Sequence, residues 1–482
     1  MINEKTFPTS YLIHSFICVV LMLSGWLLPP IASITPLGMK VLGIFIGSVY
    51  AWCLIEFVWP SLLAMMMLGV SGYSTISGVF SAGFGDIVVL QCMFTFIFIK
   101  VMDEVHLTDW LAGWFLSRKI CNGHPWTLTL MILYAAIIVG GFINLYGGIL
   151  MLWAIFYSIC KKFGFQKGNG YVVFMISAMM FLGAISAMFL PFLPLPLIIC
   201  GVTAKVVPNL LIPYTAWMGL GIFLTVLFPL LFTFTARFIF RFDLSQMASI
   251  NMSEFISMAK MNKEQKFAGC MLILFVAILI LPNVVPEGAF KSLLASFGVL
   301  GAAISAMIIL CCRRNAQGER ITNFNTMAAK GLNWDIVIMF AATMPISAAL
   351  ESPDCGILST ILGALLPFFQ QLGGIAFVVL TFICLTLVTQ VAHNLVIMIA
   401  VLPTLAGVCV SLGISPVLYV FLLSILLQAA FVTPGASAQA ALVFGQTAWL
   451  SSKSAMFYGT VYAILTLLVV LILAFPIGLV LF

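Results

Sequence analysis

Long apolar runs follow one another along almost the whole chain, separated by proline, glycine or short polar segments. The runs are continuous rather than alternating, so they predict helices and not strands. A helix that crosses the hydrocarbon core of a bilayer needs about 20 apolar residues. Applied along the chain, this length predicts eleven crossing helices, near 11–28, 38–57, 60–74, 83–103, 171–205, 213–236, 266–282, 292–312, 334–350, 415–447 and 455–481.

Two further apolar stretches, 127–159 and 375–410, do not fit a simple crossing. The first holds 33 residues, which is long for one crossing and short for two, because two need about 40. Basic clusters around Lys119 and Lys161 flank it and place both of its ends in the cytoplasm. We therefore expect a re-entrant hairpin, whose non-helical tip is buried in protein or lines a cavity. The second stretch predicts a matching hairpin.

The chain repeats part of its pattern. Three pairs of residues recur in order at offsets of 249, 250 and 243: Asp86 with Asp335, Asn144 with Asn394, and Pro191 with Pro434. Both aspartates begin a span, where they fit helix N-caps. Because these two spans run in opposite directions across the membrane, the halves form an inverted repeat. Inverted repeats with broken helices are typical of secondary transporters.

This repeat divides the chain into four parts. We expect N-terminal scaffold helices, a first repeat, an interfacial segment with further scaffold helices, and a second repeat, at 1–82, 83–241, 242–333 and 334–482. The predicted fold is thus an all-α polytopic membrane protein. It has about 11 transmembrane helices and two re-entrant hairpins.

The composition removes most other classes of protein. Of the 482 residues, 63% are hydrophobic and 7% are charged, whereas a soluble domain carries about 25% charged residues. This excludes a soluble enzyme, a nucleic-acid-binding protein and a disordered chain. The net charge of +6 fits basic cytoplasmic loops. We therefore expect an integral protein of the plasma (inner) membrane, with a cytoplasmic N-terminus, an external C-terminus and no cofactor.

Polar residues gather where the helices are expected to break. Asn144 lies at the first hairpin tip, and the second tip reads Thr-Gln-Val-Ala-His-Asn at 389–394. The spans that follow are interrupted at 191–196 and 433–439. Broken helices leave backbone N–H and C=O groups without partners, and these groups bind anions and cations. The sequence therefore predicts a binding site where the tips and breaks meet.

Three stretches carry a resemblance to a known family. The run Pro-Gly-Ala-Ser-Ala-Gln-Ala-Ala-Leu-Val-Phe-Gly at 434–445 and the run Thr-Gln-Val-Ala-His-Asn-Leu at 389–395 resemble motifs of the divalent anion:sodium symporter family, part of the ion transporter superfamily. The segment 140–155 is similar to the first hairpin of that family. The resemblance implies alternating access, a small dicarboxylate-like substrate and a homodimer.

The resemblance also implies two sets of site residues. Substrate contacts are expected at Asn144, His393, Asn394, Leu395, Thr433 and Ser437. A cation site is expected at Thr389, Ala392, Asn394 and Ala436.

The sequence departs from the family where the family binds sodium. The serine and threonine hydroxyls of its two Ser-Asn-Thr triplets are missing, and Gly140 stands where the first cation site has a serine. Two hypotheses for coupling follow. In one, His393 takes a proton in place of sodium, since an unperturbed imidazole titrates near pH 6.5, and the protein is proton-coupled or an exchanger. In the other, one sodium ion binds at Thr389 and Asn394, and His393 only packs.

Each polar residue also has a purely structural explanation. Asn144 and Asn394 also fit polar contacts between helices, but their repeat-related places at the two hairpin tips favour a role in the site. Thr433 and Ser437 are equally explained as partners for the backbone groups that a break sets free.

The leading hypothesis is secondary active transport of small organic anions. Recognition then rests on helix ends and asparagine side chains, because no Lys or Arg falls at a hairpin tip and Lys100 is expected at the membrane interface. A sodium-coupled symporter and an uncoupled anion channel or facilitator are alternatives. An enzyme is disfavoured, because we find no H-E-x-x-H motif, no paired carboxylates within a span and no nucleotide-binding loop.

Overall fold

The computed structural model describes residues 9–482 except 142–144, 208–209, 253–259, 284, 287, 315–317, 319, 321, 358, 361–362, 364–366, 368–370 and 372. Every regular element in these residues is a helix, and one isolated β-bridge joins Arg314 to Arg320. Six helices in the described ranges are long and apolar enough to cross a membrane, or up to eight if each bent pair forms one span. The protein is an all-α polytopic membrane protein, as predicted, while the number of eleven crossings stays a prediction.

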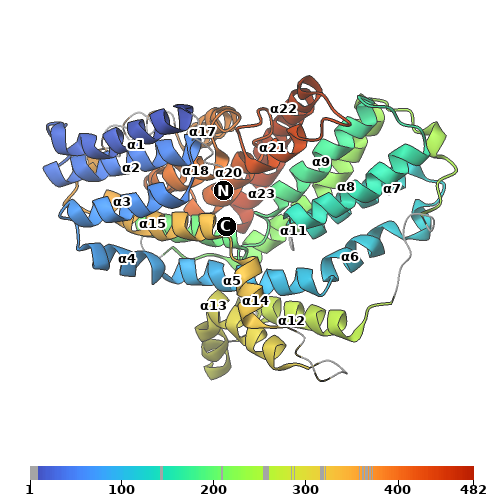
Figure 1. The fold of residues 1–482 in the computed structure, drawn as a ribbon, viewed down its shortest axis with the longest axis horizontal. Helices are drawn as coiled ribbons and strands as arrows, with labels where there is room; N and C mark the ends of the chain where they lie inside the picture. The colour runs from blue at the N-terminus through green and yellow to red at the C-terminus, as the bar shows by residue number, and fades with distance from the viewer. Residues whose placement is uncertain are drawn as a thin grey trace, which may run out of the picture.

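The first half of the chain begins with four helices at one end of the molecule, coloured blue in Figure 1. They are α1 (Thr9–Leu27), α2 (Pro36–Leu54), α3 (Val58–Val70) and α4 (Ile76–Phe84). The elements that follow are α5 (Ile87–Glu104), α6 (Leu107–Leu116), η1 (Lys119–Cys121), α7 (Pro125–Ala135), η2 (Ala136–Gly141), α8 (Leu145–Lys162), α9 (Gly170–Ser186), α10 (Pro194–Val206), α11 (Tyr214–Phe234) and η3 (Thr235–Ile239).

A middle group of helices lies below α5 in the view of Figure 1. It comprises α12 (Lys263–Ile280), η6 (Leu281–Asn283), α13 (Ala289–Cys312) and α14 (Phe324–Gly331). The short element η4 (Ser245–Met247) precedes this group in the chain. The second half then contains α15 (Trp334–Glu351), α17 (Gly374–Val388), α18 (Asn394–Ala400), α19 (Leu402–Ser411), α20 (Pro416–Gln428), α21 (Ala438–Phe444), α22 (Ser452–Val469), η7 (Val470–Ala474) and α23 (Phe475–Leu481).

The two halves present the same order of elements. A long helix (α5 or α15) is followed by a helical hairpin (α7, η2 and α8, or α17 with α18 and α19), a broken pair (α9 and α10, or α20 and α21) and another long helix (α11 or α22). This order agrees with the predicted repeat. The opposite orientation of the halves, the re-entrance of the hairpins and the four-part division stay predictions.

The centre of the protein is built from the first helix of each broken pair. Nearly every residue of α9 and α20 is buried, on all faces of both helices. A helix that is hydrophobic all round belongs in a core, and these two lie against each other. Each ends at a break, so the fold brings both interrupted helices to the middle of the molecule.

Two helices lie between the expected spans, and one of them, α14, contributes to the site. The helix α6 follows α5, and α14 packs against α5. The approach of α14 is close, because a Cβ atom at Gly331 would lie 2.7 Å from the Cβ atom of Lys100. The end of α14 is therefore held beside Lys100 on α5.

The aspartates of the repeat differ in their structural roles. Asp86 caps α5, with its Oδ1 accepting a hydrogen bond from the Val88 N–H at 2.9 Å, as predicted. Its other oxygen lies 3.2 Å from Lys205 Nζ. Asp335 does not cap α15, because Asn333 takes that place. The expectation of a cap at Asp335 was therefore wrong, although its carboxylate lies in the first turn of α15, where the helix dipole favours a negative charge.

Candidate functional site

A cavity of about 610 Å³ lies where the two hairpins meet the two helix breaks. The hairpins contribute Gly140, Gly141, Leu145, Tyr146, His393, Asn394 and Leu395. The breaks contribute Ala187, Leu193, Pro194, Leu195, Gln428, Ala438 and Gln439. The positions at which both halves interrupt their helices therefore share one space, while binding at this space stays a prediction.

Asn394 joins the second hairpin tip to the second break. Its backbone N–H donates to the Ala436 carbonyl at 3.0 Å, and its side-chain amide donates to Gln428 Oε1 at 2.7 Å. Its own Oδ1 accepts from the Leu395 N–H at 2.8 Å. Asn394 and Gln428 are 4% and 2% exposed, so these amides form the buried inner end of the cavity.

Gln390 replaces the helical hydrogen bonds that α20 loses where it ends. Its Oε1 accepts from the N–H groups of Phe431 and Val432 at 3.1 and 3.2 Å. Its Nε2 donates to the carbonyls of Thr386 and Ala429 at 2.8 and 3.1 Å. In a membrane such freed groups must find protein partners. The tip and the break are thereby tied into one unit.

The other predicted residues of the second half lie behind the cavity wall. The Thr433 hydroxyl donates to the Gln390 carbonyl at 2.7 Å, and the Thr389 hydroxyl donates to the Leu427 carbonyl at 3.3 Å. Ser437 caps α21, accepting from the Ala440 N–H at 3.0 Å. The structure thus brings His393, Asn394 and Leu395 to the cavity, and it gives the two threonines and Ser437 backbone partners.

The predicted cation site is built from oxygens that already take part in hydrogen bonds. Thr389 Oγ1, Asn394 Oδ1 and the Ala436 carbonyl each have the protein partner described above. Ala392 lies between Thr389 and Asn394 at the tip and is partly buried. Within the described residues, no group of three His, Cys, Asp or Glu side chains is placed to hold a metal ion.

His393 lines the cavity at the start of α18. Its ring meets Phe57 edge-on, with the ring centroids 5.7 Å apart. Its Nδ1 is buried and has no hydrogen-bond partner among the described residues. One ring nitrogen therefore remains for a proton or a ligand, while the aromatic contact fits the packing hypothesis, and both hypotheses stay open.

The first hairpin reaches the cavity through two glycines at the end of a π-helix. A Cβ atom at Gly141 would overlap the side chain of Ser186, so only glycine lets η2 approach α9 this closely. Such π-helical turns are frequent at functional sites. Asn144 lies outside the described residues, so its predicted role stays a prediction.

Sequence reasoning missed the charged residues of the cavity. Lys100 from α5, Lys330 from α14 and Asp335 from α15 line it. The side chain of Lys330 is 52% exposed and that of Lys100 24%, so they mark the open end. The position of Lys100 at the membrane interface stays a prediction, and the structure adds that Lys100 lines the cavity. The sequence did contain a signal for Lys100, because an ionisable residue inside an apolar run is a functional candidate by default.

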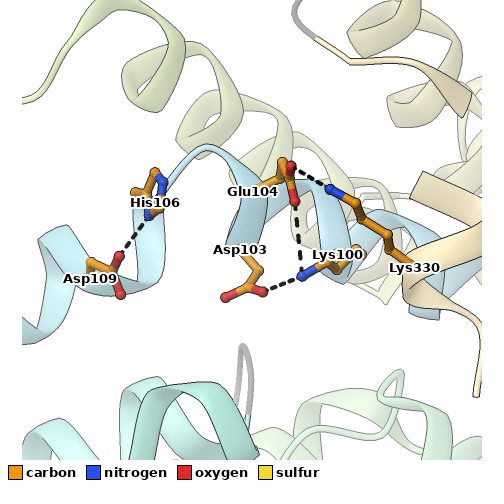
Figure 2. Close-up of polar contacts among 6 residues, drawn as sticks. All are labelled: Lys100, Asp103, Glu104, His106, Asp109 and Lys330. Atoms are coloured by element: carbon orange, nitrogen blue, oxygen red, sulfur yellow. Dashed lines mark hydrogen bonds and ion pairs between the residues drawn. The ribbon is translucent and has the colours of Figure 1, made fainter. Parts of the chain in front are cut away.

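The lysines are already paired with acidic side chains, as Figure 2 shows. Lys100 Nζ lies 2.6 Å from Asp103 Oδ2 and 4.0 Å from Glu104 Oε2. Lys330 Nζ lies 3.0 Å from Glu104 Oε1. A second pair in the same view, His106 with Asp109 at 2.7 Å, involves no residue of the cavity wall.

A cavity formed by two hairpins and two broken helices in an all-helical membrane protein defines a membrane transporter. The chain belongs to the citrate transporter family (CitMHS), whose family model matches residues 41–317, more than half of the sequence. This places it among the secondary transporters of anions. The narrower resemblance to the divalent anion:sodium symporters stays a prediction.

Two solved transporters have a similar structure. The YdaH transporter of Alcanivorax borkumensis matches with a TM-score of 0.58 and 15% sequence identity, over 98% of each chain. MtrF of Neisseria gonorrhoeae, described within a class of antimetabolite efflux pumps, matches with a TM-score of 0.61 and 15% identity, over 98% of this chain and 96% of that one. At this identity the likeness shows the fold alone. Comparison with curated protein sequences gave no match.

Proposed function

We propose that this protein is a secondary active transporter of small polycarboxylates, of the citrate or dicarboxylate type, that works by alternating access. The observation that carries the proposal is the shared cavity, which joins both hairpins and both helix breaks. The family model, described as a citrate transporter, supports the substrate class. The broken helices supply the polar backbone groups that such sites use.

The size and charge of the cavity support this substrate class. Its volume of about 610 Å³ lies within the range of roughly 300–1,000 Å³ that is usual for small-molecule sites. Two lysines and one aspartate line the cavity. The lysines are paired with Asp103 and Glu104, so they offer an anion two ammonium groups in exchange for those partners. The inner end offers the amides of Asn394 and Gln428, which hydrogen-bond a carboxylate without adding charge.

The moving part in this proposal is the second hairpin together with its break. Gln390 and Asn394 tie the tip to the break, so the two move as one body against α5 and α15. If the basic loops lie in the cytoplasm, the lysine end of the cavity faces the cytoplasm and the C-terminus faces outward. A plasma-membrane location and a homodimer complete this proposal.

Two coupling mechanisms are compatible with the site. His393 supports a proton-coupled transporter or an exchanger, because its Nδ1 is buried in the cavity wall without a partner among the described residues. The oxygens of Thr389, Asn394 and Ala436 support a sodium-coupled symporter. An uncoupled channel is the third candidate, and it is the one that the next experiment addresses first.

The test is counterflow with the purified full-length protein in proteoliposomes. Vesicles loaded with citrate should take up labelled citrate transiently against its gradient, and succinate should compete better than acetate. The measurement is repeated with and without sodium, at about pH 6 and about pH 8, on either side of the ordinary histidine pKa. Citrate flux without counterflow would indicate a channel, and no polycarboxylate flux would refute the proposal.

A matched pair of variants connects this activity to the cavity. Asn394→Ala removes the amide that lines the inner end and should raise the KM for citrate or abolish transport. Asn325→Ala changes an exposed residue of α14 that does not line the cavity and should leave transport unchanged. Equal effects of the two substitutions would count against the cavity as the transport site.

A further inference from the structure

The carboxylate of Glu104 bridges two lysines that belong to the cavity wall. One oxygen lies 3.0 Å from Lys330 Nζ and the other 4.0 Å from Lys100 Nζ. Lys100 also contacts Asp103 at 2.6 Å. As Figure 2 shows, the lysines come from two helices and point toward Glu104. A carboxylate is thus already held between two ammonium groups at the open end of the cavity.

The packing of α14 keeps the two lysines together. Gly331, the neighbour of Lys330, lies so close to α5 that a Cβ atom there would be 3.3 Å from the Phe96 carbonyl oxygen. Lys330 and Lys100 both line the cavity, whereas Glu104 and Asp103 do not. The ammonium groups are therefore shared between the cavity and the acidic end of α5.

We propose that Lys100 and Lys330 form a carboxylate-binding subsite at the cavity entrance, which Glu104 fills until a carboxylate of the substrate displaces it. This inference rests on the proposed function and deepens it. The subsite favours an anion with at least two carboxylates, one bound by the lysines and another directed toward the amides of Asn394 and Gln428. A monocarboxylate can bind either the lysines or the amides, but not both at once.

Displacement of Glu104 is easy for physical reasons. The side chains of Lys330 and Glu104 are 52% and 42% exposed, and ion pairs this exposed are weak. A freed Glu104 returns to solvent, and a substrate carboxylate takes its place beside Lys330 and Lys100. Lys100 keeps its nearer partner, Asp103, throughout. Glu104 therefore acts as a competitor built into the chain, present at a high effective concentration.

Two explanations of the cluster predict opposite changes in the KM for citrate when Glu104 is replaced by glutamine. In one, Glu104 competes with the substrate; in the other, it only holds α14 against α5. If the cluster only fastened α14 to α5, removing Glu104 and removing Lys330 would harm transport alike. If Glu104 competes with the substrate, Glu104→Gln lowers the KM for citrate, while Lys330→Gln and Lys100→Gln raise it. The sign of the Glu104→Gln effect therefore separates the two explanations.

The experiment measures the KM and kcat of citrate counterflow in proteoliposomes for the full-length protein and its variants. We expect Glu104→Gln to lower the KM, and each lysine-to-glutamine change to raise it, by about two- to fivefold, the range for exposed ion pairs. Lys330→Arg keeps the charge and should restore a KM near that of the parent. High ionic strength should raise the parent KM more than that of the lysine variants.

Controls and contrary outcomes are built into the same series. Asp109→Asn breaks an ion pair outside the cavity wall, and Lys453→Gln removes an exposed lysine that does not line the cavity. Both variants should have the KM and kcat of the parent. The unfolding temperature of each variant without substrate shows that it is folded. A raised KM in Glu104→Gln, or an unchanged KM in both lysine-to-glutamine variants, overturns the subsite while transport stands. A parent that moves no polycarboxylate overturns both proposals.

Discussion

The side chain of Gln390 offers the sharpest test of how the second break is held. It is 9% exposed and supplies four hydrogen bonds, two accepted from the N–H groups of Phe431 and Val432 and two donated to carbonyls. Gln390→Leu keeps a side chain of similar size and removes all four bonds. The backbone groups of the break then remain buried without partners.

The magnitude follows from the two N–H groups, because each has a single hydrogen to donate and loses its one partner. A carbonyl oxygen has two lone pairs and therefore depends less on one partner. A buried donor without a partner costs about 1–3 kcal/mol, whereas hydrogen bonds measured inside membrane proteins average about 0.6 kcal/mol. Two donors at these limits give roughly 1–6 kcal/mol, and we expect a loss of about 3 kcal/mol in the free energy of unfolding. That corresponds to a factor of roughly 150 in the unfolding equilibrium.

Gln446→Leu is the matched control. Gln446 accepts one hydrogen bond from the Tyr157 hydroxyl at 2.9 Å and donates one to the Leu442 carbonyl at 3.3 Å. Because the hydroxyl rotates and no backbone N–H is orphaned, its loss should be about 1 kcal/mol or less. Unfolding of purified protein in detergent micelles, by heat and by denaturing detergent, measures both. A loss in Gln390→Leu no larger than in the control would refute the reasoning.

Three further predictions concern the glycine contact, the coupling ion and the topology. Gly141→Ala should lower stability by about 1–3 kcal/mol through overpacking against Ser186, whereas Gly435→Ala, with no atom within 4 Å of the added Cβ, should leave the unfolding temperature unchanged. If His393 takes the coupling proton, His393→Ser should abolish the pH dependence of citrate uptake without sodium; saturating sodium dependence that survives the substitution would remove the histidine hypothesis. Cysteines placed at Lys119 and Lys167 should react with an impermeant label from the same side, and labelling from opposite sides would contradict the re-entrant first hairpin.

Much of the secondary structure could be predicted because its signals are local. The stretch predicted as the first hairpin, 127–159, corresponds to helices that run from Pro125 to Lys162. The second, 375–410, corresponds to helices from Gly374 to Ser411. Apolar length indicates where a span lies, and a cluster of prolines, or proline next to glycine, marks an interruption. A single proline does not, because Pro229 and Pro345 stay inside the continuous helices α11 and α15. The breaks near Pro191 and Pro434 follow from these rules without any knowledge of packing.

Only the tertiary structure decided what lines the cavity. Lys100 and Lys330 stand on different helices, and they meet because Gly331 lets α14 pack against α5. Gln390 could be read from the sequence as a polar residue at a tip, yet its bonds to the break depend on two segments about 40 residues apart. Which faces of distant helices meet is set by the fit of their side chains over the whole core, and one apolar run looks much like another. The sequence by itself therefore determined the helices and their interruptions, and packing decided which charges and amides share the cavity.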